Sequence, residues 1–147
     1  MKRKRKKTFN EYKFNIIEPL SATGSRCIRI YAELPKEKMN NIYSNDMDQK
    51  AVEYININIE KNNVDNNVFK VFNLDAAQLM YHNQKFFDVI DLDPYGTAIP
   101  FIDSCINCSK NGAFLYILNW IRLLFNSYCL FFITYINKKS LMKFKFI

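Results

Sequence analysis

Residues 86–96, FFDVIDLDPYG, place a short apolar run directly before two aspartates, a proline and a glycine. This pattern predicts a buried strand over residues 86–90 that runs into Asp91 and then into a turn. Strands of this length, each followed by polar residues, recur along the chain. Their spacing therefore decides the fold class.

Similar apolar segments predict four other strands, over residues 14–18, 41–46, 68–72 and 113–117. Helical patterns lie between them, over residues 26–34, 48–61, 75–80 and from Thr97 to about Gly112. Asp48 and Thr97 fit helix N-caps, and Pro35 closes the first helix. Strand and helix alternation at this spacing predicts an α/β fold with a parallel sheet and helices on both faces.

Acidic residues lie at or just beyond four of the predicted strand ends: Glu18, Asp46, Asp75 and Asp93. In open α/β sheets, ligands bind in the crevice outside the carboxyl ends of the strands. We therefore expect at least two of these four acids to serve a ligand. The alternative is that they cap helices, which is the role expected for Asp48.

The turn after the first strand, Ser21-Ala22-Thr23-Gly24, contains one glycine, whereas dinucleotide-binding turns contain three. A dinucleotide is disfavoured, because its pyrophosphate requires close approach of the backbone. S-adenosylmethionine carries no phosphate and suits a turn of small residues. Asp46 would then accept the ribose hydroxyls, and Asp75 with the backbone of Ala76 would read the adenine edge.

The tripeptide Asp93-Pro94-Tyr95 has the acid–proline–aromatic pattern of methyltransferases that act on exocyclic amines of nucleobases. Such an amine is a weak nucleophile, because its lone pair is shared with the ring. A carboxylate and a carbonyl that accept its N–H bonds draw the lone pair toward the methyl group, and proline fixes the local backbone. An aromatic ring stacks on the base and sets the reacting distance. The alternative is an ordinary Asp-Pro turn.

Residues 20–29 (LSATGSRCIR), Asn45-Asp46, residues 91–97 (DLDPYGT) and residues 100–104 (PFIDS) together resemble the tRNA (guanine-26-N2)-dimethyltransferases. The resemblance runs from about Ile16 to Ile117. It implies a Rossmann-like class I methyltransferase domain that transfers one or two methyl groups from S-adenosylmethionine to N2 of a tRNA guanine. Tyr95 replaces the phenylalanine usual in the family and keeps the stacking face.

The resemblance also implies roles for individual residues. The cofactor contacts fall on Arg26, Asp46, Asp75 and Ala76, with Gly24 in the turn beside them. Asp93 would be catalytic, and Pro94 and Tyr95 would form the pocket of the base.

Outside residues 14–117 the resemblance ends. We expect residues 1–13 to be a basic disordered tail, the sheet to be incomplete after the fifth strand, and residues 118–147 to be an apolar tail with a basic end. A chain of this kind is expected to be poorly soluble and to have little or no activity, because its sheet edge would be unpaired. It reads as a fragment, and its tail fits translated non-coding sequence.

Residues 118–136 are long and apolar enough to be a weak transmembrane candidate. Arg122 and polar residues within the segment oppose that reading, and no stable membrane association is expected. Of the four cysteines, Cys105 and Cys108 have zinc-type spacing but lack partner ligands, so no metal is expected.

The net charge is +7, and residues 2–7 form an unbroken basic run. The run fits a nuclear address, a phosphate-seeking arm or a solvated tail, so nucleus, mitochondrion and cytoplasm stay open. tRNA is the expected partner. The alternatives are an amino-methyltransferase acting on DNA or protein, an inactive truncated product, and a non-catalytic protein that binds a membrane or nucleic acid.

Overall fold

A computed structural model describes residues 11–123, 126–135 and 145–146, and the side chains of residues 11–118. The elements, in chain order, are β1 (Phe14–Glu18), α1 (Ser25–Glu33), the 3-10 turn η2 (Lys36–Lys38), β2 (Met39–Asn45), α2 (Gln49–Lys61), β3 (Phe69–Phe72), α3 (Ala76–His82), β4 (Phe87–Leu92), the 3-10 turn η3 (Ile99–Phe101), α4 (Ile102–Cys108), β5 (Ser109–Leu123), β6 (Asn126–Tyr135) and β7 (Lys145–Phe146). Each of the five strands expected from the sequence is present.

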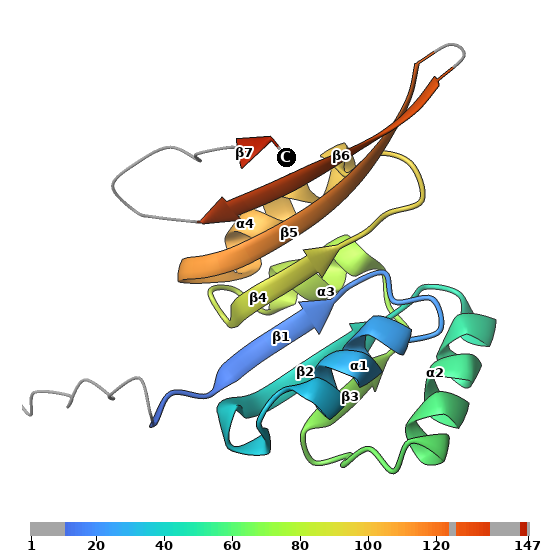
Figure 1. The fold of residues 1–147 in the computed structure, drawn as a ribbon, viewed down its shortest axis with the longest axis vertical. Helices are drawn as coiled ribbons and strands as arrows, with labels where there is room; N and C mark the ends of the chain where they lie inside the picture. The colour runs from blue at the N-terminus through green and yellow to red at the C-terminus, as the bar shows by residue number, and fades with distance from the viewer. Residues whose placement is uncertain (1–10, 124–125, 136–144, 147) are drawn as a thin grey trace, which may run out of the picture.

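The strands form one sheet in the order β3-β2-β1-β4-β5-β6-β7 (Figure 1). Strands β1 to β5 are parallel to one another. Helices α1 and α2 cover one face of this parallel part, and α3 and α4 cover the other. The predicted α/β fold, with a parallel Rossmann-like sheet between two layers of helices, is confirmed.

Successive residues of a strand point to opposite faces, and this alternation builds two cores. Ile16 packs with the buried side of α1 and α2, whereas Ile17 packs with α3 and α4. On α2 the buried residues Val52, Ile55 and Ile59 recur at helical spacing, as their sequence pattern predicts. Because both faces of the sheet are covered, the central strands are apolar on both sides.

The strand order reverses between β1 and β4. From β1 the chain moves outward to β2 and β3, then crosses to the other side of β1 to form β4. The loops after β1 and β4 therefore leave in opposite directions at this point. Such a topological switch point is where α/β sheets bind ligands, at the carboxyl ends of the strands.

The fourth helix and the fifth strand differ from their expected bounds. We expected a helix from Thr97 to about Gly112, but α4 begins only at Ile102, after η3, and ends at Cys108, and β5 begins at Ser109. The N–H of Ser109 bonds to the carbonyl of Cys105 and closes the helix there. Gly112, at φ 88°, lies in a register irregularity of the β4–β5 pairing and does not cap the helix.

The sheet also continues beyond the expected fifth strand. β5 extends to Leu123, and β6 pairs with it antiparallel from Phe114↔Tyr135 to Leu123↔Asn126. The expected unpaired edge at the fifth strand is therefore covered by a neighbouring backbone. An uninterrupted apolar run does not by itself distinguish a strand from a buried helix, which is why the sequence did not predict β6.

Residues 118–123 and 126–135 are strand, so the transmembrane candidate is not a helix where the structure describes it. In the described part of the chain, no helix is both long and apolar enough to cross a membrane. Most of the basic end of the expected tail, and the basic run at residues 2–7, lie outside the described residues.

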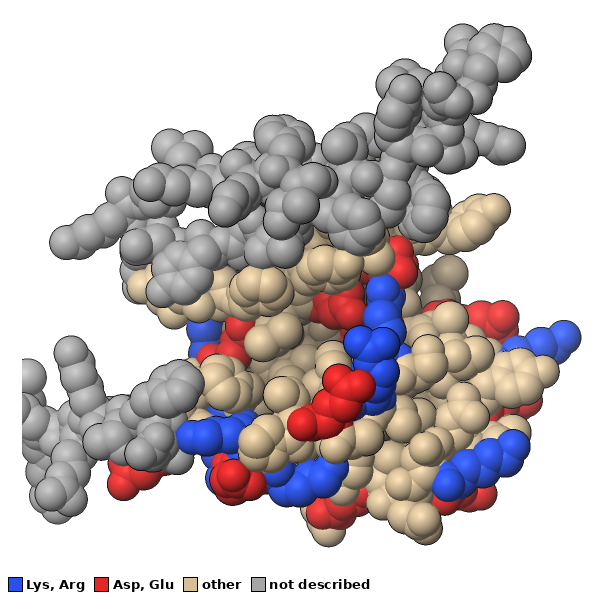
Figure 2. All heavy atoms as spheres, in the orientation of Figure 1, with Lys and Arg blue, Asp and Glu red and all other residues tan. Residues whose placement is uncertain are grey.

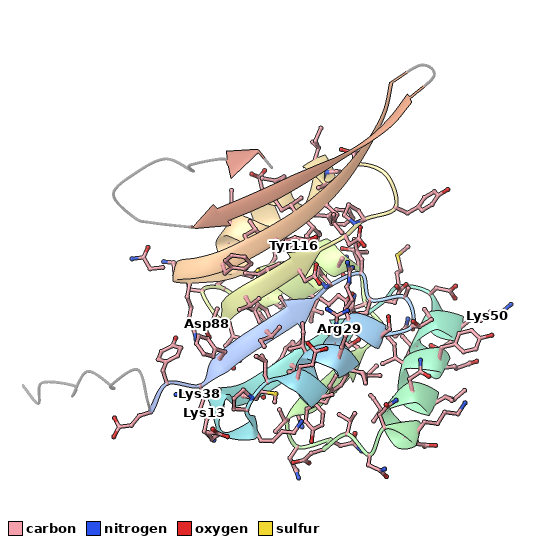
Figure 3. The ribbon with its side chains drawn as sticks, viewed as in Figure 1. Lys13, Arg29, Lys38, Lys50, Asp88 and Tyr116 are labelled. Carbon is pink, nitrogen blue, oxygen red and sulfur yellow. The ribbon has the colours of Figure 1, made fainter. Side chains whose placement is uncertain are left out.

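At the amino ends of the strands, Asp88 of β4 anchors a polar cluster (Figure 3). Its carboxylate accepts hydrogen bonds from the hydroxyl of Tyr12 (2.5 Å) and the N–H of Asn15 (2.8 Å), and pairs with Lys110 (2.6 Å). Tyr12, which we had placed in the tail, is thus tied to the sheet. This cluster lies at the amino ends of the strands, and the switch point lies at their carboxyl ends.

Candidate cofactor and catalytic site

The acids expected to serve a ligand all lie at the carboxyl edge of the parallel sheet. Glu18 ends β1, Asp46 follows β2, Asp75 follows β3 and Asp93 follows β4. Because the strands are parallel, these four positions share one edge. The fold thus brings together carboxylates that are up to 75 residues apart in the sequence.

Arg26 is the centre of the site. Its Nε lies 2.8 Å from Glu18 Oε1 and 3.3 Å from Asp91 Oδ2, and its Nη1 lies 2.8 Å from Asp93 Oδ2. One guanidinium therefore links the end of β1 to the end of β4 across the switch point. Burial lowers the pKa of Arg26, but the hydrogen bond that it donates to Glu18 and the negative charges of Asp91, Glu18 and Asp93 outweigh this effect and raise the pKa overall.

The position of Arg26 follows from the local structure. The turn after β1 starts α1 at Ser25, so Arg26 is the second helical residue and faces the strand ends. Glu18 also accepts the backbone N–H of Cys27 (3.3 Å), which ties this acid to the first turn of the same helix. Figure 2 shows acidic and basic side chains adjacent to one another in the middle of the face viewed there.

Asp91 is the acid of the group with a buried, unpaired oxygen. The residue is 8% exposed, and its Oδ1 is buried without a hydrogen-bond partner. The pKa of Asp91 is raised from 3.8 to about 6: burial is the largest cause and raises it, the charge of Arg26 lowers it, and the carboxylates of Glu18 and Asp93 raise it. Asp91 is therefore held in the site at a cost to stability at neutral pH.

Asp46 joins the second strand to the turn of the first. Its Oδ2 accepts the N–H of Ala22 (2.9 Å), and its Oδ1 accepts the N–H of Asp48 (3.0 Å). The preceding residue, Asn45, is fully buried and donates to the carbonyls of Pro19 and Leu74, both at 2.9 Å. Asn45 thus fixes three loops of the carboxyl edge relative to one another.

Asp75 and Ala76 start α3. Asp75 caps the helix by accepting the N–H of Gln78 (2.9 Å), and Ala76 is 3% exposed beneath it. Exposed apolar side chains accompany the acids on these loops: Met47 (70% exposed) follows Asp46, and Leu74 (46% exposed) precedes Asp75. An adenine ring between the two loops would contact apolar atoms on its faces and polar atoms at its edge.

Pro94 and Tyr95 differ in exposure. Pro94 is buried, which fixes the backbone directly after Asp93. The side chain of Tyr95 is fully exposed, and Ile99 near it in sequence is 76% exposed.

Position 24 of the turn requires glycine, because a side chain would not fit there. Its φ is +70°, and an added Cβ would lie 3.1 Å from Cγ1 of Ile55 and 3.3 Å from Oγ of Ser44. The single glycine of the turn is thus required by backbone conformation and by the packing of α2.

We expect Gly24→Ala to lower the free energy of unfolding by about 2 kcal/mol, because a Cβ at positive φ is strained and Ile55 must shift. Urea unfolding followed by circular dichroism measures the change.

The matched control is Ala22→Gly in the same turn, where φ is +49°. That change relieves backbone strain in the folded state but increases the conformational entropy of the unfolded chain. The free energy of unfolding should therefore stay within about 1 kcal/mol of the wild-type value. Equal stability of Gly24→Ala and wild type would contradict the prediction.

Among the described residues, no group of three or more His, Cys, Asp or Glu side chains has an arrangement that could hold a metal ion. Cys27, Cys105 and Cys108 are buried free thiols. Burial raises the pKa of each of them, so they remain protonated and unreactive at neutral pH.

Two residues of the site were missed by reasoning from the sequence. Asp91 is part of the motif but was given no role, although it lies two positions before Asp93 and both acids contact Arg26. Asn45 was likewise quoted without a role, because its contacts are all with distant loops. The i, i+2 spacing of Asp91 and Asp93 is a signal that could have identified the first.

The chain is similar to known proteins over most of its described residues. A family model described as "N2,N2-dimethylguanosine tRNA methyltransferase" matches residues 1–119. The chain is 46% identical over 110 residues to the mitochondrial tRNA (guanine(26)-N(2))-dimethyltransferase of Saccharomyces cerevisiae. The aligned region covers 72% of this chain and 19% of the yeast protein. The chain is 36% identical over 104 residues to the enzyme of that name from Homo sapiens, covering 69% of this chain and 15% of the human one. The chain therefore spans less than a fifth of the length of either relative.

Solved structures give the same result for the fold. Trm1 from Pyrococcus horikoshii, in complex with S-adenosyl-L-methionine, superposes with a TM-score of 0.67 at 25% identity, over 72% of this chain and 31% of that one. TYW2 from the same organism superposes with a TM-score of 0.62 at 17% identity, over 74% of this chain and 39% of that one, which shows the shared fold alone. With its matched residues 1–119 and its parallel sheet, the chain belongs to the N2,N2-dimethylguanosine tRNA methyltransferase family.

Proposed function

We propose that this chain is part of an enzyme that transfers methyl groups from S-adenosylmethionine to the N2 amine of guanine 26 in tRNA. The observation that carries the proposal is the row of acids along one edge of the sheet. Asp75, Asp46 and Asp93 follow β3, β2 and β4, with β1 and Arg26 between the last two. The order matches that of the parts of the cofactor: adenine, ribose and the methyl-bearing end.

The described residues fit S-adenosylmethionine. Asp46 retains acceptor capacity on both oxygens beyond its two backbone hydrogen bonds, as a ribose diol requires. Asp75 and the backbone of Ala76 would read the adenine edge, and Gly24 would allow the ligand to approach the turn. Arg26 would hold the carboxylate of the methionyl end. When bound, the cofactor supplies an electrophilic methyl group on a sulfonium.

Asp93 would accept an N–H bond from the exocyclic amine of guanine and so turn its lone pair toward the methyl group. Its carboxylate is already oriented by Arg26, at 2.8 Å, and its backbone is fixed by buried Pro94. Tyr95 presents a free aromatic face on which a guanine that has left its stack can lie. Proton loss from the amine can follow transfer, so Asp93 need not be a strong base.

tRNA is the substrate that the relatives favour, since the proteins matched by this chain are named for tRNA guanine 26. DNA and protein amines remain the alternatives that a substrate test must include. The yeast relative is named as mitochondrial. We propose nucleus or mitochondrion as the compartment, consistent with the basic run at residues 2–7.

The test separates cofactor binding from methyl transfer. Equilibrium dialysis of the purified chain against radiolabelled S-adenosylmethionine measures binding. We expect Asp46→Ala to weaken it by about 10-fold to 100-fold, because two ribose hydroxyls lose a charged acceptor. Asp65→Ala, an exposed acid in the turn before β3, is the control and should bind like the wild type.

Methyl transfer is measured in a chimera in which residues 14–117 replace the matching segment of the Saccharomyces cerevisiae relative. Transcripts of tRNA with guanine or adenine at position 26, duplex DNA and histone are offered with the labelled cofactor. We expect label only on the tRNA with guanine 26. Label on DNA or protein, or a wild-type chain that does not bind the cofactor, would contradict the proposal.

A further inference from the structure

The loops that follow β2 and β3 are connected by two asparagine side chains. These strands are neighbours in the sheet, and their backbone pairing ends at Asn45↔Phe72 (Figure 1). Beyond that pair, the N–H of Asp46 donates to the carbonyl of Phe72 at 3.3 Å, which is longer than most bonds of this kind. The loops that carry Asp46 and Asp75 therefore begin where the sheet itself no longer fixes their spacing.

Asn45 binds the loop after β3 in the way that a neighbouring strand would. Its Nδ2 donates to the carbonyl of Leu74 (2.9 Å), and its Oδ1 accepts the N–H of Leu74 (3.0 Å). This exchange of two bonds reproduces, with a side-chain amide, the pairing of two residues in antiparallel strands. Asn45 is fully buried, and its Nδ2 also donates to the carbonyl of Pro19. Leu74, the residue before Asp75, is thus fixed to the end of β2.

Asn73 makes the reciprocal connection, from the loop after β3 to the loop after β2. Its Nδ2 donates to the carbonyls of Asp46 (2.9 Å) and Met47 (3.1 Å). Together, the amides of Asn45 and Asn73 make four hydrogen bonds between the two loops. Unlike Asn45, Asn73 is exposed, so its side chain can be removed without opening a cavity in the core.

The apolar side chains of these loops contribute little packing between them, because Met47 is 70% exposed and Leu74 is 46% exposed. In the proposed function, Asp46 binds the ribose hydroxyls and Asp75 the adenine edge, so the nucleoside of the cofactor lies across both loops. A ligand that contacts two loops binds more tightly when both are already ordered, since ordering them on binding costs conformational entropy.

We propose that Asn73 is a positioning residue for the cofactor site. With Asn45 as its fixed counterpart, it holds the loops after β2 and β3 at the spacing that the nucleoside spans, and it acts through the backbone of Asp46. This inference rests on the proposed function and deepens it, because it assigns the preorganisation of the nucleoside site to a side chain other than the proposed ligand-binding acids.

The test variant is Asn73→Ala in the purified chain. Equilibrium dialysis measures binding of radiolabelled S-adenosylmethionine directly, and binding of unlabelled methylthioadenosine by competition. Methylthioadenosine contains the same nucleoside and lacks the amino-acid end. We expect both ligands to bind about 5-fold to 20-fold more weakly, because the loop that bears Asp46 must then be ordered on binding. Unchanged affinity for both ligands, or a loss for S-adenosylmethionine alone, would overturn the proposal.

A double-mutant cycle with Asp46→Ala separates positioning from a general effect on the fold. If Asn73 acts by placing Asp46, its removal should weaken cofactor binding by less than about threefold once Asp46 is already alanine. A general loss of structure would instead give the same loss in either background. A further loss as large as that of the single variant would therefore refute the role of Asn73.

The matched control is Asn62→Ala at the end of α2. Asn62 is also exposed, and its Nδ2 likewise donates to a backbone carbonyl, that of Asn58 (2.8 Å). Both variants should lower the midpoint of urea unfolding slightly, whereas the affinity for S-adenosylmethionine should fall in Asn73→Ala alone. An equal loss of affinity in the two variants would rule out a specific role for Asn73.

The outcomes also distinguish this inference from the proposed function. If Asp46→Ala loses cofactor binding and Asn73→Ala binds like the wild type, the proposed function stands and the positioning role is refuted. If the wild-type chain binds no S-adenosylmethionine, the proposed function fails and takes this inference with it.

Discussion

Replacement of Asp93 by alanine is expected to reduce methyl transfer to tRNA by about 10²-fold to 10³-fold in the chimera that carries residues 14–117. This is the range measured when one preorganised polar group is removed from a reacting centre. The carboxylate is the group that would draw the guanine lone pair out of the ring, and no other described acid follows β4 at this place. Single-turnover transfer of label from S-adenosylmethionine to tRNA measures the rate.

Two further measurements make the result specific. Cofactor affinity of Asp93→Ala should remain within about threefold of wild type, because Asp93 is assigned to the base and not to the cofactor. The control variant is Asp103→Ala, an exposed acid in the first turn of α4, which should transfer methyl groups at the wild-type rate. An Asp93→Ala chimera with more than a tenth of the wild-type rate would remove Asp93 from the mechanism.

Replacement of Arg26 by alanine is expected to lower the free energy of unfolding by about 3 kcal/mol at pH 7.5. Removing one partner of a buried ion pair costs about 3–5 kcal/mol, because the remaining charges are left uncompensated. The lower end applies here, since the side chain of Arg26 is 33% exposed. Glu18 and Asp91, with side chains 3% and 12% exposed, lose their counter-ion together.

The loss should depend on pH in a defined direction. The pKa of Asp91 is about 6 in the folded chain, above its ordinary value of 3.8, so its neutral form favours folding. The stability that this gives is complete below about pH 4 and is lost as the pH rises through 6. Because Arg26 lowers this pKa, the variant should have a still higher one. Arg26→Ala should therefore be least damaging near pH 5 and most damaging above pH 7.

Urea unfolding of wild type and variant at pH 5 and pH 8 measures both effects. The control is Arg29→Ala, on the same helix and labelled in Figure 3. The side chain of Arg29 is 76% exposed and pairs with Glu33 at i, i+4, so its loss should cost less than about 0.5 kcal/mol at either pH. If Arg26→Ala is no less stable than Arg29→Ala, the ion cluster has no structural role.

Much of the parallel sheet was predictable because its signals are local. The apolar run at residues 14–18 matches β1 residue for residue, and Asp48 caps α2 as its position predicts. β5 and α4 were placed less well. The boundary between them depends on the pairing of β5 with β4, and on a glycine that serves an irregular strand and not a helix end. Neither feature has a local signature.

The site shows the same division. Asp46, Asp75 and Asp93 were identified from their places at strand ends, because a parallel sheet necessarily gathers such residues at one edge. Their roles toward cofactor and base remain proposals. The buried acceptor of Asp91 and the contacts of Asn45 could not be predicted, since each depends on which loops meet at that edge.

By itself, the sequence determined the alternation of strands and helices, the row of acids and the acid–proline–aromatic motif, since each of these is encoded within about ten neighbouring residues. Only the tertiary structure decided that Arg26 of α1 meets Glu18, Asp91 and Asp93 at the junction of β1 and β4. Those charges come from segments more than 60 residues apart in the chain. Their distances, burial and pKa values exist only once the strand order has placed β4 beside β1.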